Sequence, residues 1–90
     1  MDVLSPAALL DPSRMMTCPP PGAVNVAVGK AVDGPGGTWV PCVTEVAAGV
    51  FWSGVFEVGP GRHQVCDQTN LATVEDAFGQ AKALAASAAA

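Results

Sequence analysis

The sequence predicts an α+β domain in which a three- or four-stranded antiparallel meander packs against one C-terminal amphipathic helix. Two patterns lead to this prediction. From residue 24 to residue 67, apolar residues alternate with small or polar ones in short segments, and glycine-rich turns separate the segments. From Thr73 onward, apolar residues instead recur at spacings of three and four, which is typical of a helix with one buried stripe.

The length and composition of the chain support a single domain. Ninety residues, of which 50% are hydrophobic and only 13% are charged, are too apolar for an intrinsically disordered chain. They are also too few for a multidomain enzyme. We therefore divide the sequence into an N-terminal arm, residues 1–22, and one α+β domain, residues 23–90.

The N-terminal arm is expected to be irregular or to contain short helical turns. Ser5-Pro6 and Asp11-Pro12 each resemble a helix N-cap followed by proline at the first helical position. Each dipeptide is followed by about one turn of helix-forming residues, the second of them over residues 13–16. A run of three prolines then predicts an extended link to the domain.

Four strands are expected, and the turn residues between them set their limits. The glycine- and proline-rich segments 33–37 and 59–61 are expected turns, and Gly49 lies in a short loop. Pro41 lies inside the second strand, and proline cannot donate to the hydrogen-bond ladder. That strand is therefore expected to lie at the sheet edge or to carry a bulge. The expected strands are 24–32, 38–46, 50–58 and 62–67.

The third strand, residues 50–58, is apolar on both faces. Trp52 and Phe56 share one face, while Phe51 and Val55 share the other. A single helix can cover only one face of the sheet, so the other face requires a second cover. The N-terminal arm supplies enough apolar residues to fold back over the sheet. A second copy of the chain or a partner protein is the alternative.

The bulky residues of the second and third strands form the expected contact surface. Tryptophan is enriched at the centres of protein interfaces, and the alternative is that each tryptophan is a core residue. The predicted interaction surface consists of Trp39, Phe51, Trp52 and Val55.

The predicted helix covers about residues 73–88 and has a capped N-terminus. Thr73 is the expected N-cap, and Glu75 and Asp76 favour the positive end of the helix dipole. Phe78 has the largest side chain of the apolar stripe, so we expect it to anchor the helix to the sheet.

The distribution of charged and apolar residues excludes several classes of function. The formal net charge is −4, and the basic residues lie at least 16 positions apart, so no basic cluster could neutralise nucleic-acid phosphates. No run reaches the roughly 18 consecutive apolar residues of a membrane span. The N-terminus lacks the basic start of a signal peptide. We expect a cytoplasmic protein that binds neither nucleic acid nor membranes.

Cysteine and histidine are the only residue types here that suggest metal or thiol chemistry. His63 is the single histidine, and with Cys18, Cys42 and Cys66 it makes a notional zinc-binding set. Only His63 and Cys66 are close in sequence, and residues three apart on a strand point to opposite faces. We expect no metal, no cofactor and no catalytic residue, and we keep His63, Cys66 and Cys42 as the weaker candidate ligands.

These observations predict a small non-enzymatic protein that binds another protein or itself. An accessory, adaptor or inhibitor protein fits a short acidic chain whose sheet is apolar on both faces, and a homodimer through the sheet is one form of it. A phage-type inhibitor of a host complex belongs to this class, because such inhibitors are often short and acidic. The alternative is a metal- or thiol-dependent protein that uses Cys42, His63 and Cys66.

Overall fold

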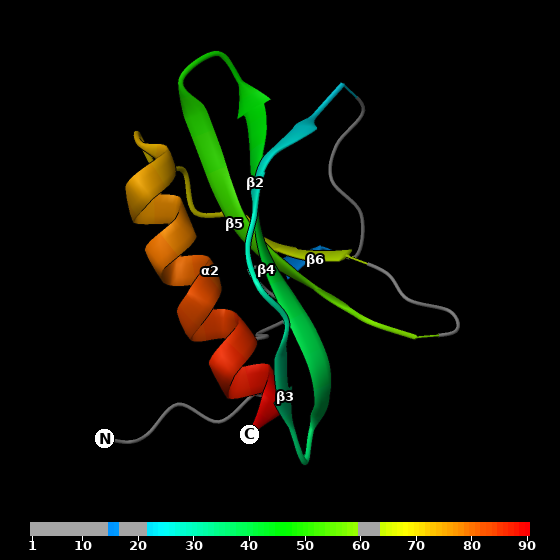
Figure 1. Ribbon diagram of the computed structural model, residues 1–90. Helices are drawn as coiled ribbons and strands as arrows, with labels where there is room; N and C mark the ends of the chain where they lie inside the picture. Colours follow the sequence, from blue (N-terminus) through cyan, green and yellow to red (C-terminus); the bar gives the residue numbers. More distant parts are fainter. Residues whose placement is uncertain (1–14, 17–21, 60–63) are drawn as a thin grey trace.

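An antiparallel sheet and one helix form the two layers of the structure (Figure 1). The computed structural model describes residues 15–16, 22–59 and 64–90. Helix α2 crosses one face of the sheet, which confirms the predicted α+β class and the C-terminal helix. The elements are β1 (Met15–Met16), β2 (Val24–Val28), β3 (Val32–Gly34), β4 (Gly37–Ala47), β5 (Val50–Glu57), β6 (Gln64–Asp67) and α2 (Val74–Ala89).

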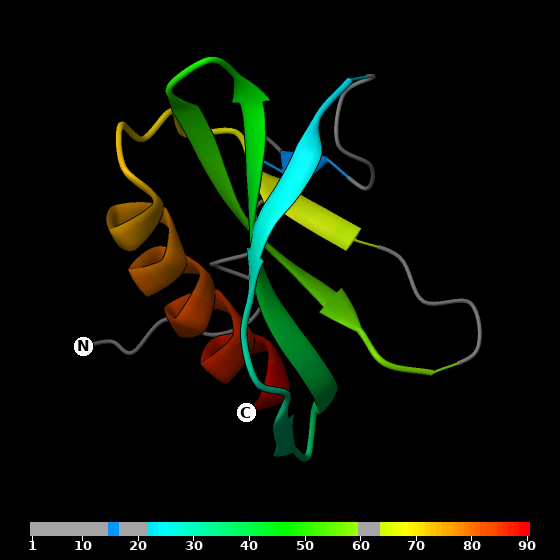
Figure 2. The same cartoon turned by 45° about the horizontal axis from the view of Figure 1, so that its top comes forward.

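Strand β4 lies inside the sheet, whose order is β1-β6-β5-β4-β2. It pairs with β5 along most of its length, from Trp39 opposite Glu57 to Ala47 opposite Val50. On its other side β4 pairs with β3 and then with β2, which follow one another along the same side of β4 (Figure 2). All of these pairs are antiparallel, so the successive strands from β3 to β6 form the predicted meander.

Part of the N-terminal arm belongs to the sheet. Met15 pairs with Asp67 and Met16 pairs with Cys66, so β1 extends the sheet beyond β6. The prediction of a helical turn is therefore wrong at Met15 and Met16, because pairing with β6 holds the backbone extended there. The other predictions for the arm, including its role as a cover for the sheet, concern residues 1–14 and 17–21, which lie outside the described residues.

Pro41 lies in a central strand, although the sequence predicted an edge or a bulge. The backbone N–H of Gly29 donates a hydrogen bond of 2.9 Å to the carbonyl oxygen of Pro41. In a strand, the N–H and C=O groups of one residue point toward the same neighbouring strand. The N–H group that Pro41 lacks would therefore also point toward the segment that contains Gly29. Strand β4 does carry a register shift, between Glu45 and Ala47, but not at Pro41. The edge prediction is wrong because the neighbouring strand is itself interrupted opposite the proline.

This interruption also divides the predicted first strand, residues 24–32, into β2 and β3. A Cβ atom on Gly29 would lie 2.7 Å from Cζ of Phe78 and 2.9 Å from Cγ of Pro41. The Phe78 ring of α2 and the ring of Pro41 therefore lie against Gly29, in the space where a side chain at this position would extend.

Small side chains allow α2 to lie close to the sheet. Five of its six buried residues are alanines, and the sixth is Leu84. Leu84 and Ala85 form the core cluster with Val55 of β5. The residues that pack against this cluster are Val32, Trp39 and Val65.

The anchor of the helix differs from the predicted one. Phe78 is only half-buried, and its ring lies over Gly29 with the Lys82 ammonium 5.3 Å from the ring centroid. Leu84 is the largest fully buried side chain among the described residues, with 1% of its surface exposed. The predicted apolar stripe is confirmed, but Leu84 is its anchor because it points into the centre of the layer between helix and sheet.

Both ends of α2 have hydrogen-bond partners. At the N-terminus, Oγ1 of Thr73 accepts a bond of 3.1 Å from the backbone N–H of Asp76, as predicted for an N-cap. At the C-terminus, the backbone N–H of Gly36, in the turn between β3 and β4, donates a bond of 2.9 Å to the carbonyl oxygen of Ala89. A Cβ atom on Gly36 would overlap the carbonyl oxygen of Ala88, so this turn depends on glycine.

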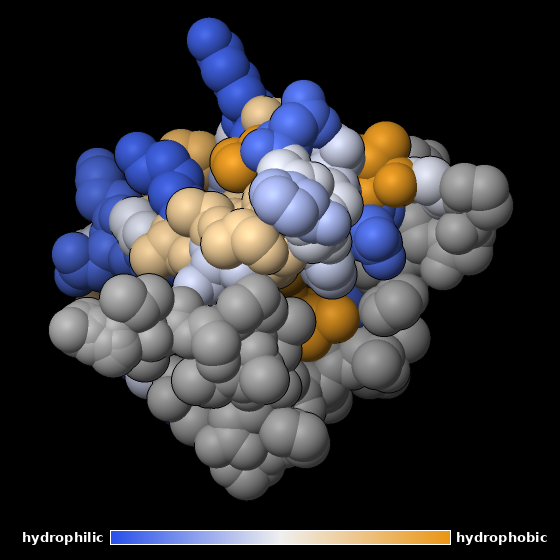
Figure 3. Space-filling model, turned by 90° about the horizontal axis from the view of Figure 1, so that it is seen from below, coloured by the Kyte–Doolittle hydropathy of each residue, from blue (hydrophilic) through white to orange (hydrophobic). Residues whose placement is uncertain are grey.

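The end of the molecule that carries this turn mixes hydrophobic and hydrophilic residues. Seen from below, the strongly hydrophobic residues form separate small patches rather than one continuous area (Figure 3). Within the described ranges, no helix is both long and apolar enough to cross a membrane.

Leu84→Ala is expected to lower the free energy of unfolding by about 2–5 kcal/mol, because it opens a cavity between α2 and β5. Urea denaturation followed by circular dichroism measures this change. Ala83→Gln, at an exposed position one residue earlier on the same helix, is the matched control and should change stability by no more than about 0.5 kcal/mol. A loss below about 1 kcal/mol for Leu84→Ala would contradict the packing described here.

Two glycine-to-alanine substitutions should have opposite effects on stability. Gly36→Ala is expected to cost about 1–3 kcal/mol, because the added methyl group pushes the turn away from the end of α2. Gly79→Ala should instead stabilise by about 0.5–1 kcal/mol, because Gly79 lies within the helix and a methyl group there would meet no other atom within 4 Å. Thermal and urea unfolding of both variants check the pair. Equal effects of the two substitutions would show that the turn does not dock on the helix.

Candidate functional site

The four residues of the predicted interaction surface lie on two different faces of the sheet. Val55 pairs with Pro41, Trp39 pairs with Glu57 and Phe51 pairs with Glu45, and these pairs lie on the face that α2 covers. Trp52 points to the opposite face, because it directly follows Phe51 and successive side chains of a strand alternate between faces. The predicted set therefore does not form one continuous surface.

Burial removes one of these residues from any contact surface. Val55 is fully buried beneath α2, so its prediction as a surface residue is wrong. Phe51 is half-buried, like both tryptophans. Each indole N–H has a partner, since Nε1 of Trp39 donates to the carbonyl oxygen of Gly36 at 3.0 Å and Nε1 of Trp52 donates to Oδ1 of Asn70 at 2.7 Å. Both tryptophans thus have structural roles.

On the face opposite α2, two cysteines lie on either side of a glycine. Cys42 of β4 pairs with Gly54 of β5, and Gly54 pairs in turn with Cys66 of β6. A Cβ atom on Gly54 would lie 3.4 Å from Sγ of Cys42 and 3.3 Å from Sγ of Cys66. The two sulfur atoms therefore border the space that a side chain at Gly54 would occupy. Both cysteines are fully buried and reduced.

Three polar side chains on the same face form a closed ring of hydrogen bonds, and one of them also donates to a thiol. Nε2 of Gln64 donates to Oγ1 of Thr44 at 2.9 Å and to Sγ of Cys66 at 3.2 Å. Oγ1 of Thr44 donates to Oδ1 of Asn25 at 2.7 Å, and Nδ2 of Asn25 donates to Oε1 of Gln64 at 3.1 Å. Because Gly54 has no side chain, Gln64 on β6 reaches Thr44 on β4 across the intervening strand β5. The ring thus joins three strands beside the thiol pair.

The environment of Cys42 keeps its thiol protonated. Burial, and then the negative charge that Cys66 acquires on ionisation, raise the pKa of Cys42 to about 12. Only the thiolate form of cysteine is a nucleophile, so Cys42 is inert toward electrophiles at neutral pH. The sulfur of Cys66 accepts a hydrogen bond of 3.2 Å from the Gln64 amide.

The structure brings together part of the predicted metal and thiol set. Cys42 and Cys66 converge, whereas His63 and Cys18 lie outside the described residues. Among the described residues, no group of three or more His, Cys, Asp or Glu side chains could hold a metal ion. A closed tetrahedral zinc site, which needs four ligands, is therefore not formed by this part of the chain alone.

Sequence reasoning missed the polar ring and the role of Gly54. Its members come from three strands and lie up to 39 positions apart, so no local motif joins them. One signal was present in the sequence. A glycine inside a strand marks a position where another group approaches closely, and Gly54 lies in the middle of the third predicted strand. The glycine indicates that another group occupies the space beside it. Only the order and register of the strands show that the residues paired with Gly54 are Cys42 and Cys66.

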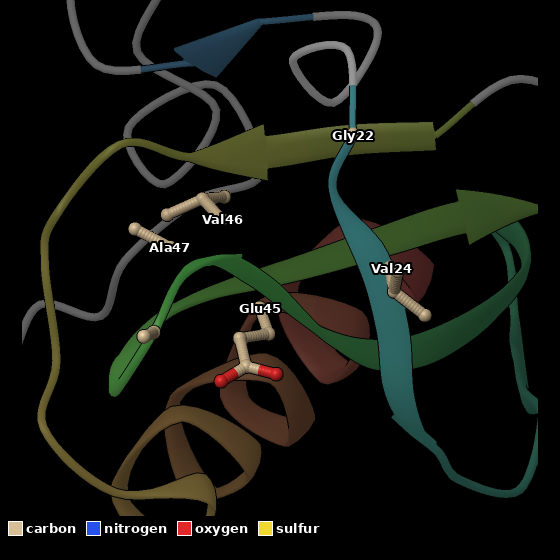
Figure 4. A pocket seen from close by; sticks show the side chains of 6 residues that line it. Gly22, Val24, Glu45, Val46 and Ala47 are labelled. Carbon is tan, nitrogen blue, oxygen red and sulfur yellow. The ribbon is translucent and has the colours of Figure 1, made fainter.

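A shallow hollow of about 300 Å³ lies between the start of β2 and the turn that joins β4 to β5. Figure 4 shows that its side chains do not point toward a common centre, since those of Glu45 and Val24 point in different directions. Oε2 of Glu45 already accepts a hydrogen bond of 3.3 Å from the backbone N–H of Gly49. A single carboxylate among apolar residues offers no general acid–base pair or nucleophile. The lining residues are Gly22, Val24, Glu45, Val46, Ala47 and Ala48.

Comparison with known proteins does not assign the chain to a family. No family model matches it, and neither a curated protein nor a solved structure is significantly similar to it.

The free energy of unfolding should fall as the pH rises from about 9 toward 12. The folded state raises the pKa of Cys42 above its ordinary value of 9.0, so in this window the unfolded chain loses a proton that the folded chain retains. Urea denaturation at a series of pH values measures the slope. Cys42→Ser should flatten the slope in this window, while Cys18→Ser serves as the control. An equal slope in the wild type and Cys42→Ser would show that Cys42 is not held protonated by folding.

Proposed function

We propose that this chain is a small non-enzymatic interaction module that contacts a protein partner through strand β2 at the edge of the sheet. The observation that supports this proposal is that all three valines of one short edge strand are exposed. The register shift within β2 places Val24 opposite Glu45 and Val28 opposite Cys42, so the two valines lie on opposite faces of this edge. Val24, Val26 and Val28 have 60%, 42% and 57% of their surface exposed. Exposed β-branched residues on an edge strand favour contact with another chain.

The composition and pairing of β2 favour the same conclusion. Its five residues carry no charge, although charged side chains are the usual protection of an edge strand against pairing. Among the described strands, β2 pairs with β4 on one side only. The register shift between Asn25 and Ala27 divides the edge into two short stretches. Such a bulge disfavours open-ended addition of further strands, so a closed complex is the expected outcome.

A second copy of the chain is the first partner to test. Two-fold interfaces use the same surface on both subunits, and β2 supplies one apolar strand of this kind. A homodimer would accordingly form through the sheet edge. An accessory, adaptor or inhibitor role, including that of a phage-type inhibitor of a host complex, is the broader form of the proposal. In each form the protein acts in the cytoplasm and binds neither nucleic acid nor membranes.

A metal- or thiol-dependent protein is the second candidate function. The observation that favours it is the convergence of Cys42 and Cys66 over Gly54, which places two sulfur atoms against one small space. The hollow near Glu45 does not support a third candidate function, because it contains a single carboxylate among apolar residues.

The β2 proposal is tested by the mass of the purified chain in solution. Light scattering is expected to give about twice the 9.0 kDa of the monomer, and Val28→Lys should return the mass to that of the monomer because it places a charge on the contact. Val58→Lys is the matched control, because Val58 is another exposed valine, 45% exposed, just beyond the end of β5.

Two results would contradict the proposed homodimer. One is a monomer at all concentrations, and the other is an equal loss of mass in Val28→Lys and Val58→Lys. Circular dichroism of each variant establishes that the change in mass does not come from unfolding. If the wild type is monomeric, cross-linking from a residue of β2 to a partner in a native lysate tests the broader proposal, and Val28→Lys should abolish that cross-link.

A further inference from the structure

We propose that Cys42 and Cys66 form a binding site for a soft, thiophilic monovalent cation, Cu(I), above Gly54. This inference is independent of the contact proposed for β2, and it gives a specific chemistry to the second candidate function. It rests on the position of the two sulfur atoms relative to one glycine on the face of the sheet opposite α2.

The geometry places both sulfur atoms within reach of one ion. Sγ of Cys42 and Sγ of Cys66 lie 3.4 Å and 3.3 Å from the point where a Cβ atom of Gly54 would be, so the two sulfur atoms are at most 6.7 Å apart. An ion that bridges them with metal–sulfur bonds of about 2.3 Å needs a separation of about 4.6 Å at most. The two sulfur atoms must come within this distance to share an ion, and no side chain of Gly54 lies between them.

The same geometry disfavours a disulfide between these cysteines. They occupy β4 and β6, with β5 between them, so their Cα atoms are separated by two strand spacings, or about 9.6 Å. A disulfide needs Cα atoms within about 6.8 Å. The two thiols can therefore share an ion without breaking strand pairing, whereas they cannot form a bond to each other.

The ligand set selects a soft ion with few ligands. Two thiolates suit Cu(I), while zinc prefers four ligands and calcium or magnesium prefer oxygen atoms. Binding releases the two thiol protons to solvent and forms two copper–sulfur bonds, with no change in oxidation state. The Gln64 amide, which donates to Sγ of Cys66 at 3.2 Å, stabilises the resulting negative charge. Thr44 and Asn25 hold that amide in place.

Competition with a chromophoric Cu(I) chelator tests the proposal on the full reduced chain. We carry out the titration in a Cys18→Ser background, so that the third cysteine does not contribute. One Cu(I) per chain is expected, and replacement of Cys42 or Cys66 by serine should weaken binding at least about 100-fold. Gln64→Leu keeps both sulfur ligands and should weaken binding about 10–100-fold.

Gly54→Ala keeps the test decisive if a cysteine variant fails to fold. The added methyl group would lie 3.3 Å and 3.4 Å from the two sulfur atoms and 3.0 Å from the carbonyl oxygen of Val65, so it should weaken binding while both thiols remain. Circular dichroism monitors the fold of each variant. Stoichiometric binding that persists without Cys42 or in Gly54→Ala would overturn the proposal, as would the absence of binding in the Cys18→Ser chain. Val24→Lys should retain Cu(I) binding, because Val24 pairs with Glu45 at the far end of β2 and not with Cys42. This variant separates failure of the ion site from failure of the β2 contact.

Discussion

The pairing of β4 with β5 is the constraint on which the rest of this structure depends. Residues that face each other across the pair share a face of the sheet, so the register places Val55 and Pro41 beneath α2. The same register places Gly54 and Cys42 on the opposite face. A slip of β5 by one residue would turn Val55 away from the helix and Gly54 toward it, so the two thiols would no longer border a position without a side chain. The core cluster and the thiol pair are therefore two consequences of one alignment.

Small residues allow parts of the molecule to approach closely, and Gly36 and Gly54 are two examples. At the end of the helix, Gly36 allows its backbone N–H to reach the carbonyl oxygen of Ala89, which joins the β3–β4 turn to α2. In the middle of the sheet, Gly54 leaves the space that Cys42 and Cys66 border. Gly36 thus allows the turn to bond to the end of the helix, and Gly54 leaves space for the proposed ion site. The alanines on the buried face of α2 likewise allow the helix to lie close to the sheet.

The two proposed sites adjoin at the central strand β4. Cys42 of β4 pairs with Val28 of β2 on one side, while β5 and β6, which carry Gly54 and Cys66, lie on the other. Asn25 connects them, since it belongs to β2 and its side chain exchanges hydrogen bonds with Gln64 of β6. A partner on β2 would thus contact a strand whose polar side chain supports the amide beside Cys66.

The sequence by itself determined the class of fold, the capped helix and which residues of β5 share a face, because side-chain periodicity and capping are local properties of the chain. For the strand with Pro41 it predicted an edge or a bulge, and β4 is a central strand with its register shift at Glu45–Ala47. It also placed Val55 at the surface, and it did not separate β2 from β3. These features depend on strand order and on where α2 lies, which are contacts between distant residues. For the same reason, only the tertiary structure decided that Cys42 and Cys66, 24 positions apart in the sequence, meet across a glycine.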